Sequence, residues 1–360
     1  MAAMKNKIPC GLVMQALLCV LAGCTMGGLA PAQRPIEVKV VIVTMFEIGA
    51  DSGDTAGEFQ LWHERQKLDV RFAFAHHHDL FFNTKSGVLA MVTGEGSINS
   101  ASSVMELGMD PRFDLSHAYW LVAGIAGVDP ERASIGSAAW AEYLVDGDLA
   151  HEIDAREMPA DWPTGYFARH TQRPYDPNKP TPDGEVLQLN PRLTEWAFEL
   201  TRGLKLGDSK DLQETRSHYE GYPNAQKPPF VLKGDTLSGM TFWHGKLLNE
   251  WAERWVQYWT EGKGQFVTSA MEDTGTFQSL TYLHPTGKVN KDRVMVLRTA
   301  SNYTMPPPGM GAAEHLIKEN QGYAGLNASV EAAYQVGSRV VDEIVRNWTI
   351  YREHIPPETR

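Results

Sequence analysis

Short strand-like apolar runs alternate with helical or loop segments along this chain of 360 residues, and the alternation restricts the folds open to it. The runs lie at residues 38–44, 70–75, 88–93, 119–123, 266–270 and 294–299. Runs of this length suit strands that are buried on both faces, and the segments between them suit crossover helices. The pattern predicts an α/β domain with a largely parallel or mixed sheet.

Helical periodicity predicts the elements that cover this sheet. Residues 97–107 and 327–348 are predicted to form amphipathic helices. A further apolar stripe recurs every four residues, at Leu247, Trp251, Trp255 and Trp259. We interpret this stripe as a buried helix face, which is favoured over a sugar-stacking platform.

Glycine-rich or polar segments end or follow three of the apolar runs, at residues 123–127, 269–272 and 300–302. The first has the sequence Ala-Gly-Ile-Ala-Gly, so a ligand can approach its backbone closely. Glu272 in the second can accept two hydrogen bonds from a vicinal diol, and Asn302 in the third offers both a donor and an acceptor. If the three segments meet at one end of the sheet, they suit a small molecule with hydroxyls and a planar ring.

The order of these segments resembles that of the purine nucleoside permease family, whose folded part is similar to the nucleoside phosphorylase and nucleosidase superfamily. The landmarks are a first strand at residues 40–47, a tight turn at 93–96, the turn at 123–127, the Met-Glu pair at 271–272 and the run ending at 300–302. The resemblance extends from about residue 38 to the C-terminal helix. It implies a three-layer fold, with a central mixed sheet flanked by helices, and binding of a purine nucleoside.

The resemblance also implies roles for individual residues. Glu272 would hold the ribose hydroxyls, with Met271 under the sugar, and Asn302 would hydrogen-bond the base. Superfamily nucleosidases have an aspartate at this last position, which protonates the base, whereas an amide cannot deliver a proton. The other expected substrate-binding residues are Thr93, Gly94, Ala126, Gly127, Leu237, Ser238 and Ser301, with Phe242 or Trp243 as a stacking face.

The attacking group in such a reaction is either phosphate or water. Phosphate requires positive potential, but the loop after the first strand contains only acidic charges, at Glu47, Asp51, Asp54 and Glu58. Water activated by Glu47 or Glu95 is therefore expected, as in a nucleosidase that releases free base and ribose without a cofactor. The alternatives are a non-catalytic nucleoside-binding component that serves a separate membrane transporter, or a superfamily fold with another ligand.

Residues 1–32 are predicted to be an export signal, because Lys5 and Lys7 precede an apolar stretch and the segment has no acidic residue. The Leu-Ala-Gly-Cys sequence that ends at Cys24 resembles a bacterial lipobox, in which the thiol is lipidated, and cleavage after Ala32 is the alternative. The expected location is the periplasm of a bacterium, either free or as a membrane-anchored lipoprotein. After this segment no run approaches the ~20 apolar residues of a membrane-spanning helix, so a self-contained channel is not expected.

Residues 33–360 are expected to form one domain, in which residues 151–233 are an insertion or lid rich in proline and turn residues. A homo-oligomer is compatible with the superfamily, whose members usually associate.

The three cysteines all lie in the predicted signal, so no disulfide, thiolate nucleophile or cysteine-bound metal is expected. Acidic residues outnumber basic ones by 44 to 33, which argues against nucleic-acid binding. Three adjacent histidines, His76-His77-His78, cannot easily share one ion because alternate strand residues point to opposite faces, and no metal site is predicted.

Overall fold

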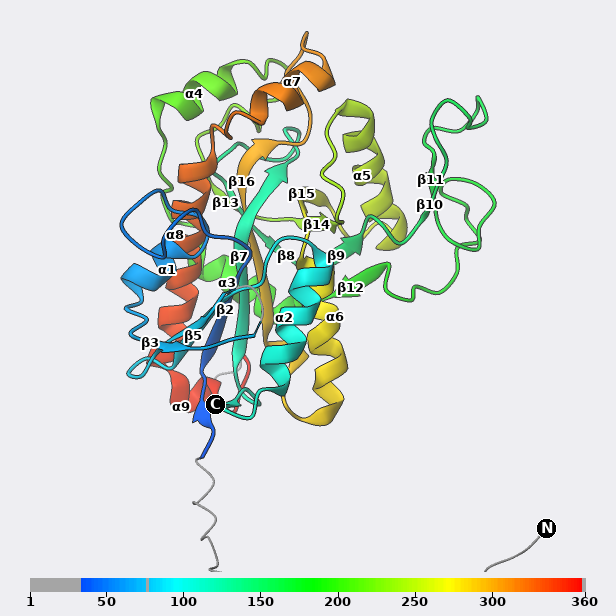
Figure 1. Cartoon of the computed structure of the whole chain (residues 1–360). Coiled ribbons are helices and arrows are strands. Elements are labelled where there is room, and N and C mark those ends of the chain that lie inside the picture. The colour runs from blue at the N-terminus through cyan, green and yellow to red at the C-terminus, as the bar shows by residue number, and fades with distance from the viewer. Residues whose placement is uncertain (1–33, 76–77, 358–360) are drawn as a thin grey trace, which may run out of the picture. The chain divides into compact units, whose positions relative to one another are not determined.

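The computed structural model describes residues 34–75 and 78–357 (Figure 1). The strands are β1 (Ile36–Glu37), β2 (Val40–Thr44), β3 (Val70–Phe72), β4 (Leu80–Asn83), β5 (Val88–Val92), β6 (Phe113–Asp114), β7 (Tyr119–Val128), β8 (Ala138–Ala141), β9 (Tyr143–Asp146), β10 (His151–Glu152), β11 (Tyr166–Phe167), β12 (Val186–Gln188), β13 (Val231–Lys233), β14 (Asp235–Ser238), β15 (Phe266–Ala270) and β16 (Val294–Tyr303). The α-helices are α1 (Gln60–Arg65), α2 (Ser97–Met109), α3 (Pro191–Thr201), α4 (Lys210–Ser217), α5 (Lys246–Trp259), α6 (Asp273–Leu283), α7 (Ala312–Glu319), α8 (Leu326–Arg346) and α9 (Trp348–Tyr351). Two short 3₁₀ helices are η1 (His284–Thr286) and η2 (Lys291–Arg293).

Twelve strands form the central sheet. One path follows the order β12-β9-β14-β15-β7-β2-β5-β4-β3, and β16 and β8 connect β7 to β13 beside it. The long strand β7 is parallel to β2 and β16 but antiparallel to β15. The mixed sheet predicted from the sequence is therefore confirmed.

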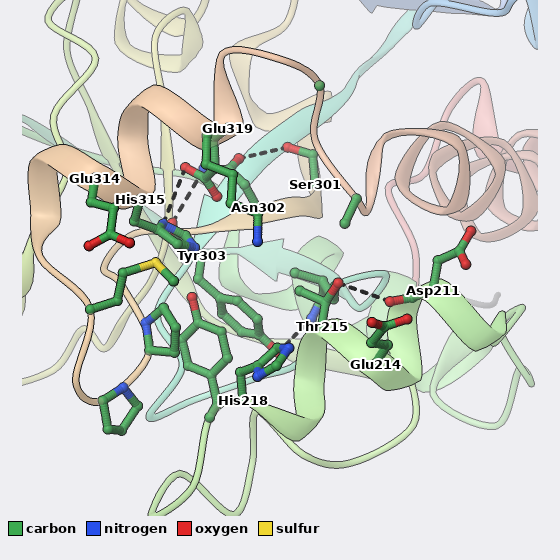
Figure 2. Close-up of a pocket in the computed structure, with 18 of the residues that line it drawn as sticks. Asp211, Glu214, Thr215, His218, Ser301, Asn302, Tyr303, Glu314, His315 and Glu319 are labelled. Carbon is green, nitrogen blue, oxygen red and sulfur yellow. Dashed lines mark hydrogen bonds and ion pairs between the residues drawn. The ribbon is translucent and has the colours of Figure 1, made fainter.

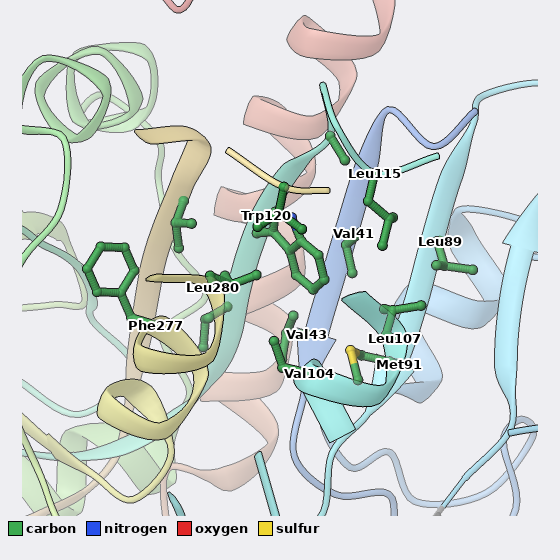
Figure 3. Close-up of a cluster of buried hydrophobic side chains, with 14 of the residues drawn as sticks. Val41, Val43, Leu89, Met91, Val104, Leu107, Leu115, Trp120, Phe277 and Leu280 are labelled. Carbon is green, nitrogen blue, oxygen red and sulfur yellow. The ribbon is translucent and has the colours of Figure 1, made fainter. Parts of the chain in front are cut away.

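Helices cover both faces of this sheet, which gives the three predicted layers. On one face, α2 and α6 pack against alternate residues of the central strands, as Figure 3 shows for Val41, Val43, Leu89, Met91, Trp120, Val104, Leu107, Phe277 and Leu280. On the other face, α1, α3 and α8 pack against the remaining residues, among them Val40, Ile42, Trp62, Leu193, Val336 and Val340. Because both faces are buried, the strand sequences are apolar at successive positions.

The predicted strand runs and helices correspond to β2, β3, β5, β7, β15, β16, α2 and α8. However, β7 continues to Val128, through the segment 123–127 that the sequence suggested was a turn, and β16 continues to Tyr303, past the expected end of its apolar run. These two strands pair with each other over that length, so the glycines and polar residues are held in extended backbone by a neighbouring strand.

The apolar stripe along α5 departs from the prediction at one position. Trp251, Trp255 and Trp259 are buried, but Leu247 is 77% exposed. A four-residue step turns about 40° past a full helical turn, so residues at this spacing drift around the helix and leave a fixed face. Leu247 lies three steps from Trp259 and has left the buried side.

Residues 151–233 separate into parts with different surroundings. The β10–β11 hairpin projects away from the central sheet beyond α5 in Figure 1. By contrast, β12 pairs with β9 at the sheet edge, and Leu193 and Ala197 of α3 belong to the core beneath α8.

Candidate functional site

A cavity of about 450 Å³ opens where the chain leaves β2, β7, β15 and β16. Its lining includes Glu95, Ala126, Gly127, Met271, Glu272, Ser301 and Asn302, all of which the sequence singled out. Segments far apart along the chain thus meet at this first cavity. The strand arrangement differs from a purely parallel one, because β15 is antiparallel to β7.

A gap in the pairing of β7 forms part of the cavity wall. On one edge of β7, β2 pairs with residues 119–122 and β15 pairs with residues 127–128. None of the described strands pairs with residues 123–126 on that edge. Ile125 lies in this gap, where its N–H donates to Glu58 Oε1 at 2.6 Å and its carbonyl accepts from Arg298 Nη1 at 3.1 Å. A Cβ at the preceding Gly124 would lie 2.5 Å from Arg298 Nη1, so only glycine allows this close approach.

Arg298 is almost fully buried and holds two carboxylates. Its Nη2 donates to Asp273 Oδ1 at 2.7 Å and to Glu272 Oε2 at 2.9 Å, and its Nε donates to Asp273 Oδ1 at 3.0 Å. Burial alone would lower the pKa of Arg298, but the two carboxylates raise it above its ordinary value, so the guanidinium stays charged. The sequence contained a signal for this cluster, since Arg298 is the charged residue within the apolar run at 294–299.

Glu272 is placed at the start of two helices. It is the N-cap residue of α6, and its Oε1 accepts from the N–H of Gly96, the N-cap residue of α2, at 2.8 Å. Burial raises the pKa of Glu272, and the Arg298 charge opposes that rise. Helix N-termini also favour a carboxylate. Glu272 can therefore present an acceptor oxygen to a ligand in the first cavity.

Glu58 is a cavity residue to which the sequence analysis gave no role. Both of its oxygens accept backbone N–H groups, from Met45 at 2.7 Å and from Ile125 at 2.6 Å. Burial raises the pKa of Glu58 to about 8. Because four acidic residues share this loop in the sequence, no local pattern distinguished Glu58 from its neighbours.

This raised pKa predicts a pH-dependent stability. The folded protein keeps a proton on Glu58 that the unfolded chain releases above its ordinary pKa of 4.5, so the free energy of unfolding falls as the pH rises from there towards 8. One proton contributes a slope on the order of 1.4 kcal/mol per pH unit. We expect Glu58→Gln to remove that slope, which urea unfolding between pH 5.5 and 7.5 measures. Glutamine can satisfy only one of the two N–H groups, so the absolute stability also falls; parallel pH curves for the two proteins would contradict the assignment.

Asn302 reaches the first cavity through a bulge in β16. The register of β16 against β7 shifts between Ala300 and Asn302, so Ser301 is the extra residue. The Ser301 hydroxyl donates to Asn302 Oδ1 at 2.9 Å. This contact orients the amide and leaves Nδ2 as its donor towards a ligand.

Glu47 lies outside the first cavity. Its carboxylate accepts backbone N–H groups from Ile48, Gly57, Phe59 and Gln60, so it closes the loop ahead of α1. These contacts occupy the carboxylate that the sequence analysis expected to activate water.

The lining of the first cavity also lacks five other expected residues, which are Thr93, Gly94, Leu237, Ser238 and Trp243. Thr93 is buried and its hydroxyl donates to the Gly94 carbonyl at 2.9 Å. Leu237 lines a separate cavity of about 130 Å³. Ser238 is buried and its Oγ accepts the N–H of Thr274 at 3.3 Å.

Two aromatic rings lie at the first cavity. Phe242 and Tyr323 both line it, and their rings are nearly parallel, with centroids 6.3 Å apart and an angle of 7° between the planes. Phe242 is 45% exposed, so part of its ring is accessible. The pair offers flat apolar faces beside Asn302.

A second cavity of about 620 Å³ adjoins the first (Figure 2). Ser301, Asn302, Glu319 and Gly322 line both cavities and form a shared wall. The second cavity is otherwise lined by α4, α7 and the segment that follows β16, with His218 and His315 among its side chains.

Comparison with known proteins identifies relatives over nearly the whole described chain. A model of the purine nucleoside permease family matches residues 37–356. A purine nucleoside permease of Candida albicans is 30% identical over 317 residues, which cover 87% of this chain and 76% of that protein. A probable purine nucleoside permease of Schizosaccharomyces pombe is 27% identical over 333 residues, covering 90% of this chain and 94% of that protein.

Two solved structures with the same fold are nucleosidases. A Helicobacter pylori MTAN variant with 5′-methylthioadenosine in the active site superposes with a TM-score of 0.52 at 14% identity, covering 85% of this chain and 99% of that one. The H. pylori 5′-methylthioadenosine/S-adenosylhomocysteine nucleosidase bound to butyl-thio-DADMe-immucillin-A gives a TM-score of 0.50 at the same identity and coverage. At this identity the likeness establishes the fold, and the predicted nucleoside phosphorylase-like fold is confirmed.

The relatives also correct one prediction. The sequence analysis placed the protein in a bacterial periplasm, whereas the curated relatives come from yeasts, which are eukaryotes, so that localisation is wrong. The expected lipidation at Cys24 and cleavage after Ala32 fall outside the described residues. Across residues 34–75 and 78–357, no helix has the length and apolar character needed to cross a bilayer.

Proposed function

Because this chain belongs to the purine nucleoside permease family, we propose that its first cavity binds a purine nucleoside. The observation that supports this most strongly is that Glu272 and Asn302 both line the cavity. A carboxylate accepts hydrogen bonds from the two ribose hydroxyls, and an amide donor recognises acceptor atoms of a purine ring. Met271 lines the cavity next to Glu272 and provides an apolar contact for the sugar.

The wall beside Asn302 suits a planar base. Phe242 and Tyr323 supply aromatic faces. Gly127 keeps the wall open, since a Cβ there would lie 3.2 Å from Thr304 Cγ2 and 3.6 Å from Asn302 Nδ2. The H. pylori structure with 5′-methylthioadenosine shows that this fold can hold a purine nucleoside derivative.

Isothermal titration calorimetry of the purified chain with inosine, adenosine and uridine tests this proposal. We expect the purine ribonucleosides to bind at one site per chain and uridine to bind more weakly, because a pyrimidine covers less of the aromatic wall. If neither purine nucleoside produces a saturable heat, the proposed function is wrong.

Hydrolysis of the N-glycosidic bond is a second candidate, favoured by Glu95 at the same cavity. Backbone N–H groups occupy the carboxylates of both Glu47 and Glu58. Glu95 is therefore the acidic residue of those considered that is placed to activate water.

Chromatography of inosine incubated with the protein distinguishes the two candidates. Release of hypoxanthine and ribose supports hydrolysis, and ribose 1-phosphate in phosphate buffer would identify a phosphorylase instead. Binding by calorimetry without release of base supports a non-catalytic nucleoside-binding protein, as a role in transport requires.

Asn302→Ala tests the base contact. We expect the affinity for purine nucleosides to fall about fivefold, because one hydrogen bond between neutral groups contributes about 1 kcal/mol. Ser301→Ala should cause a smaller loss, since the serine only orients the amide. Asn224→Ala, at an amide that lines neither cavity, is the control. Unchanged affinity of the Asn302 variant would place the base elsewhere.

A further inference from the structure

Three side chains with metal-binding atoms converge at the edge of the second cavity. His315 and Glu319 lie one turn apart on the same face of α7, and His244 lies in the loop ahead of α5. One ring nitrogen from each histidine and one carboxylate oxygen of Glu319 lie within 4.8 Å of one another. Figure 2 shows His315 and Glu319 side by side next to Asn302.

The hydrogen bonds among these residues leave two buried atoms unsatisfied. His315 Nδ1 and His244 Nε2 are 3.0 Å apart, which accounts for one hydrogen bond. His244 Nδ1 and Glu319 Oε2 have no hydrogen-bond partner among the residues that the structure describes, and the 3.8 Å between them is too long for a direct bond. The side chains of His244 and Glu319 are only 1% and 12% exposed, so solvent compensates poorly. A buried carboxylate that is ionised and has no partner is costly unless a cation lies beside it.

We propose that His244, His315 and Glu319 bind one zinc ion. Two ligand atoms at ~2.1 Å from a tetrahedral zinc ion lie about 3.4 Å apart. Glu319 Oε2 lies 3.8 Å from His244 Nδ1 and 3.8 Å from His315 Nδ1. Shifts of a few tenths of an ångström bring these separations to the required spacing, and the contact between His315 Nδ1 and His244 Nε2 opens as His315 Nδ1 turns to the ion. Imidazole with carboxylate suits zinc, whereas magnesium and calcium favour all-oxygen sites.

The site has three protein ligands and one remaining position. His315 and Glu319 line the second cavity, so that position faces open space into which water or a ligand atom can enter. Zinc sites with three protein ligands and one open position act on bound molecules, whereas purely structural sites are closed by four. The ion would also join α7 to the loop that contains His244.

The sequence analysis predicted no metal site, because the only histidine cluster visible along the chain is His76-His77-His78. In that stretch, His78 is engaged by Asp51 Oδ1 at 2.7 Å through its Nε2, and His76 and His77 fall outside the described residues. The site proposed here joins residues about 70 positions apart, and the one local sign of it is the four-residue spacing of His315 and Glu319.

Calorimetric titration of zinc chloride into tag-free, chelator-treated protein tests the site. We expect one equivalent to bind, and expect Glu319→Gln and His315→Ala each to weaken binding by at least about tenfold. His218→Ala is the matched control, because His218 lines the same cavity outside the cluster, and its affinity should equal that of the parent. Circular dichroism of each variant confirms that it is folded.

Cobalt(II) provides a measurement that needs no variant. The parent protein should develop the intense visible absorption bands of tetrahedral cobalt, and zinc should displace them. The absence of a stoichiometric zinc site in the parent would overturn the proposal. Binding that is unchanged in Glu319→Gln and His315→Ala would also overturn it, and would assign the ion to other residues such as His76-His77-His78.

Discussion

Glu272→Gln is expected to weaken binding of purine ribonucleosides by about 1.5 to 3 kcal/mol, or roughly tenfold to a hundredfold. Glutamine has nearly the same shape, but it replaces a charged acceptor with a neutral amide. Glu272 lines the first cavity, and its Oε1 has one described donor, the N–H of Gly96. Its Oε2 is held by Arg298, so Oε1 is the oxygen whose charge-assisted hydrogen bonds to the ribose diol the substitution weakens. Calorimetry with inosine or adenosine measures the loss.

The specificity of this effect can be checked with the ligand. The affinity for 2′,3′-dideoxyinosine should be weak in the parent and nearly unaffected by Glu272→Gln, since that nucleoside lacks the diol. Glu142→Gln makes the same chemical change at a carboxylate that lines neither cavity, and should bind inosine like the parent. An equal loss of affinity for inosine and dideoxyinosine would exclude Glu272 from the ribose contact.

Arg298→Met is expected to cause the largest loss of stability, about 3 to 5 kcal/mol in urea unfolding. Methionine fills part of the space but leaves the carboxylates of Asp273 and Glu272 buried without the guanidinium that contacts both. Without this charge, burial raises the pKa of Glu272 further, so its proton is bound in the folded state over a wider pH range. The deficit relative to the parent should therefore be small near pH 5 and should grow towards pH 8.

Arg293→Met is the matched control for this pH dependence. Arg293 is also buried, but its described partners are the carbonyls of His117, Tyr351 and Arg352. Its replacement should reduce stability without leaving a buried carboxylate unpaired, so the deficit should change little with pH. If the two arginine variants have the same pH profile, the carboxylates beside Arg298 do not depend on its charge.

The α/β fold was predictable because its evidence is local. Apolar runs such as 40–44 and 88–92 are buried on both faces and therefore differ clearly from the helical segments between them. The length of β7 and β16 was not predictable, because Gly124, Gly127 and Asn302 favour turns unless a neighbouring strand holds them extended. Pairing with a neighbouring strand decides whether such segments are extended or form turns.

The convergence of side chains at the first cavity was predictable where an apolar run ends, as for Glu272 after β15 and Asn302 near the end of β16, and unpredictable where a loop folds back. The sequence analysis offered Glu47 or Glu95 for chemistry, but Glu47 closes its own loop, and Glu58 reaches the cavity with Glu95. Glu47 and Glu58 belong to the same acidic stretch, and only the direction of the returning chain distinguishes them. Arg298 had a visible signal, a charge in an apolar strand, but its partners come from another segment.

The wall shared by the two cavities has a thermodynamic consequence. Ser301, Asn302, Glu319 and Gly322 face both sides, so an occupant of one cavity contacts residues that an occupant of the other also contacts. Linkage then requires reciprocity: any factor by which the ion changes the affinity for the nucleoside is the factor by which the nucleoside changes the affinity for the ion.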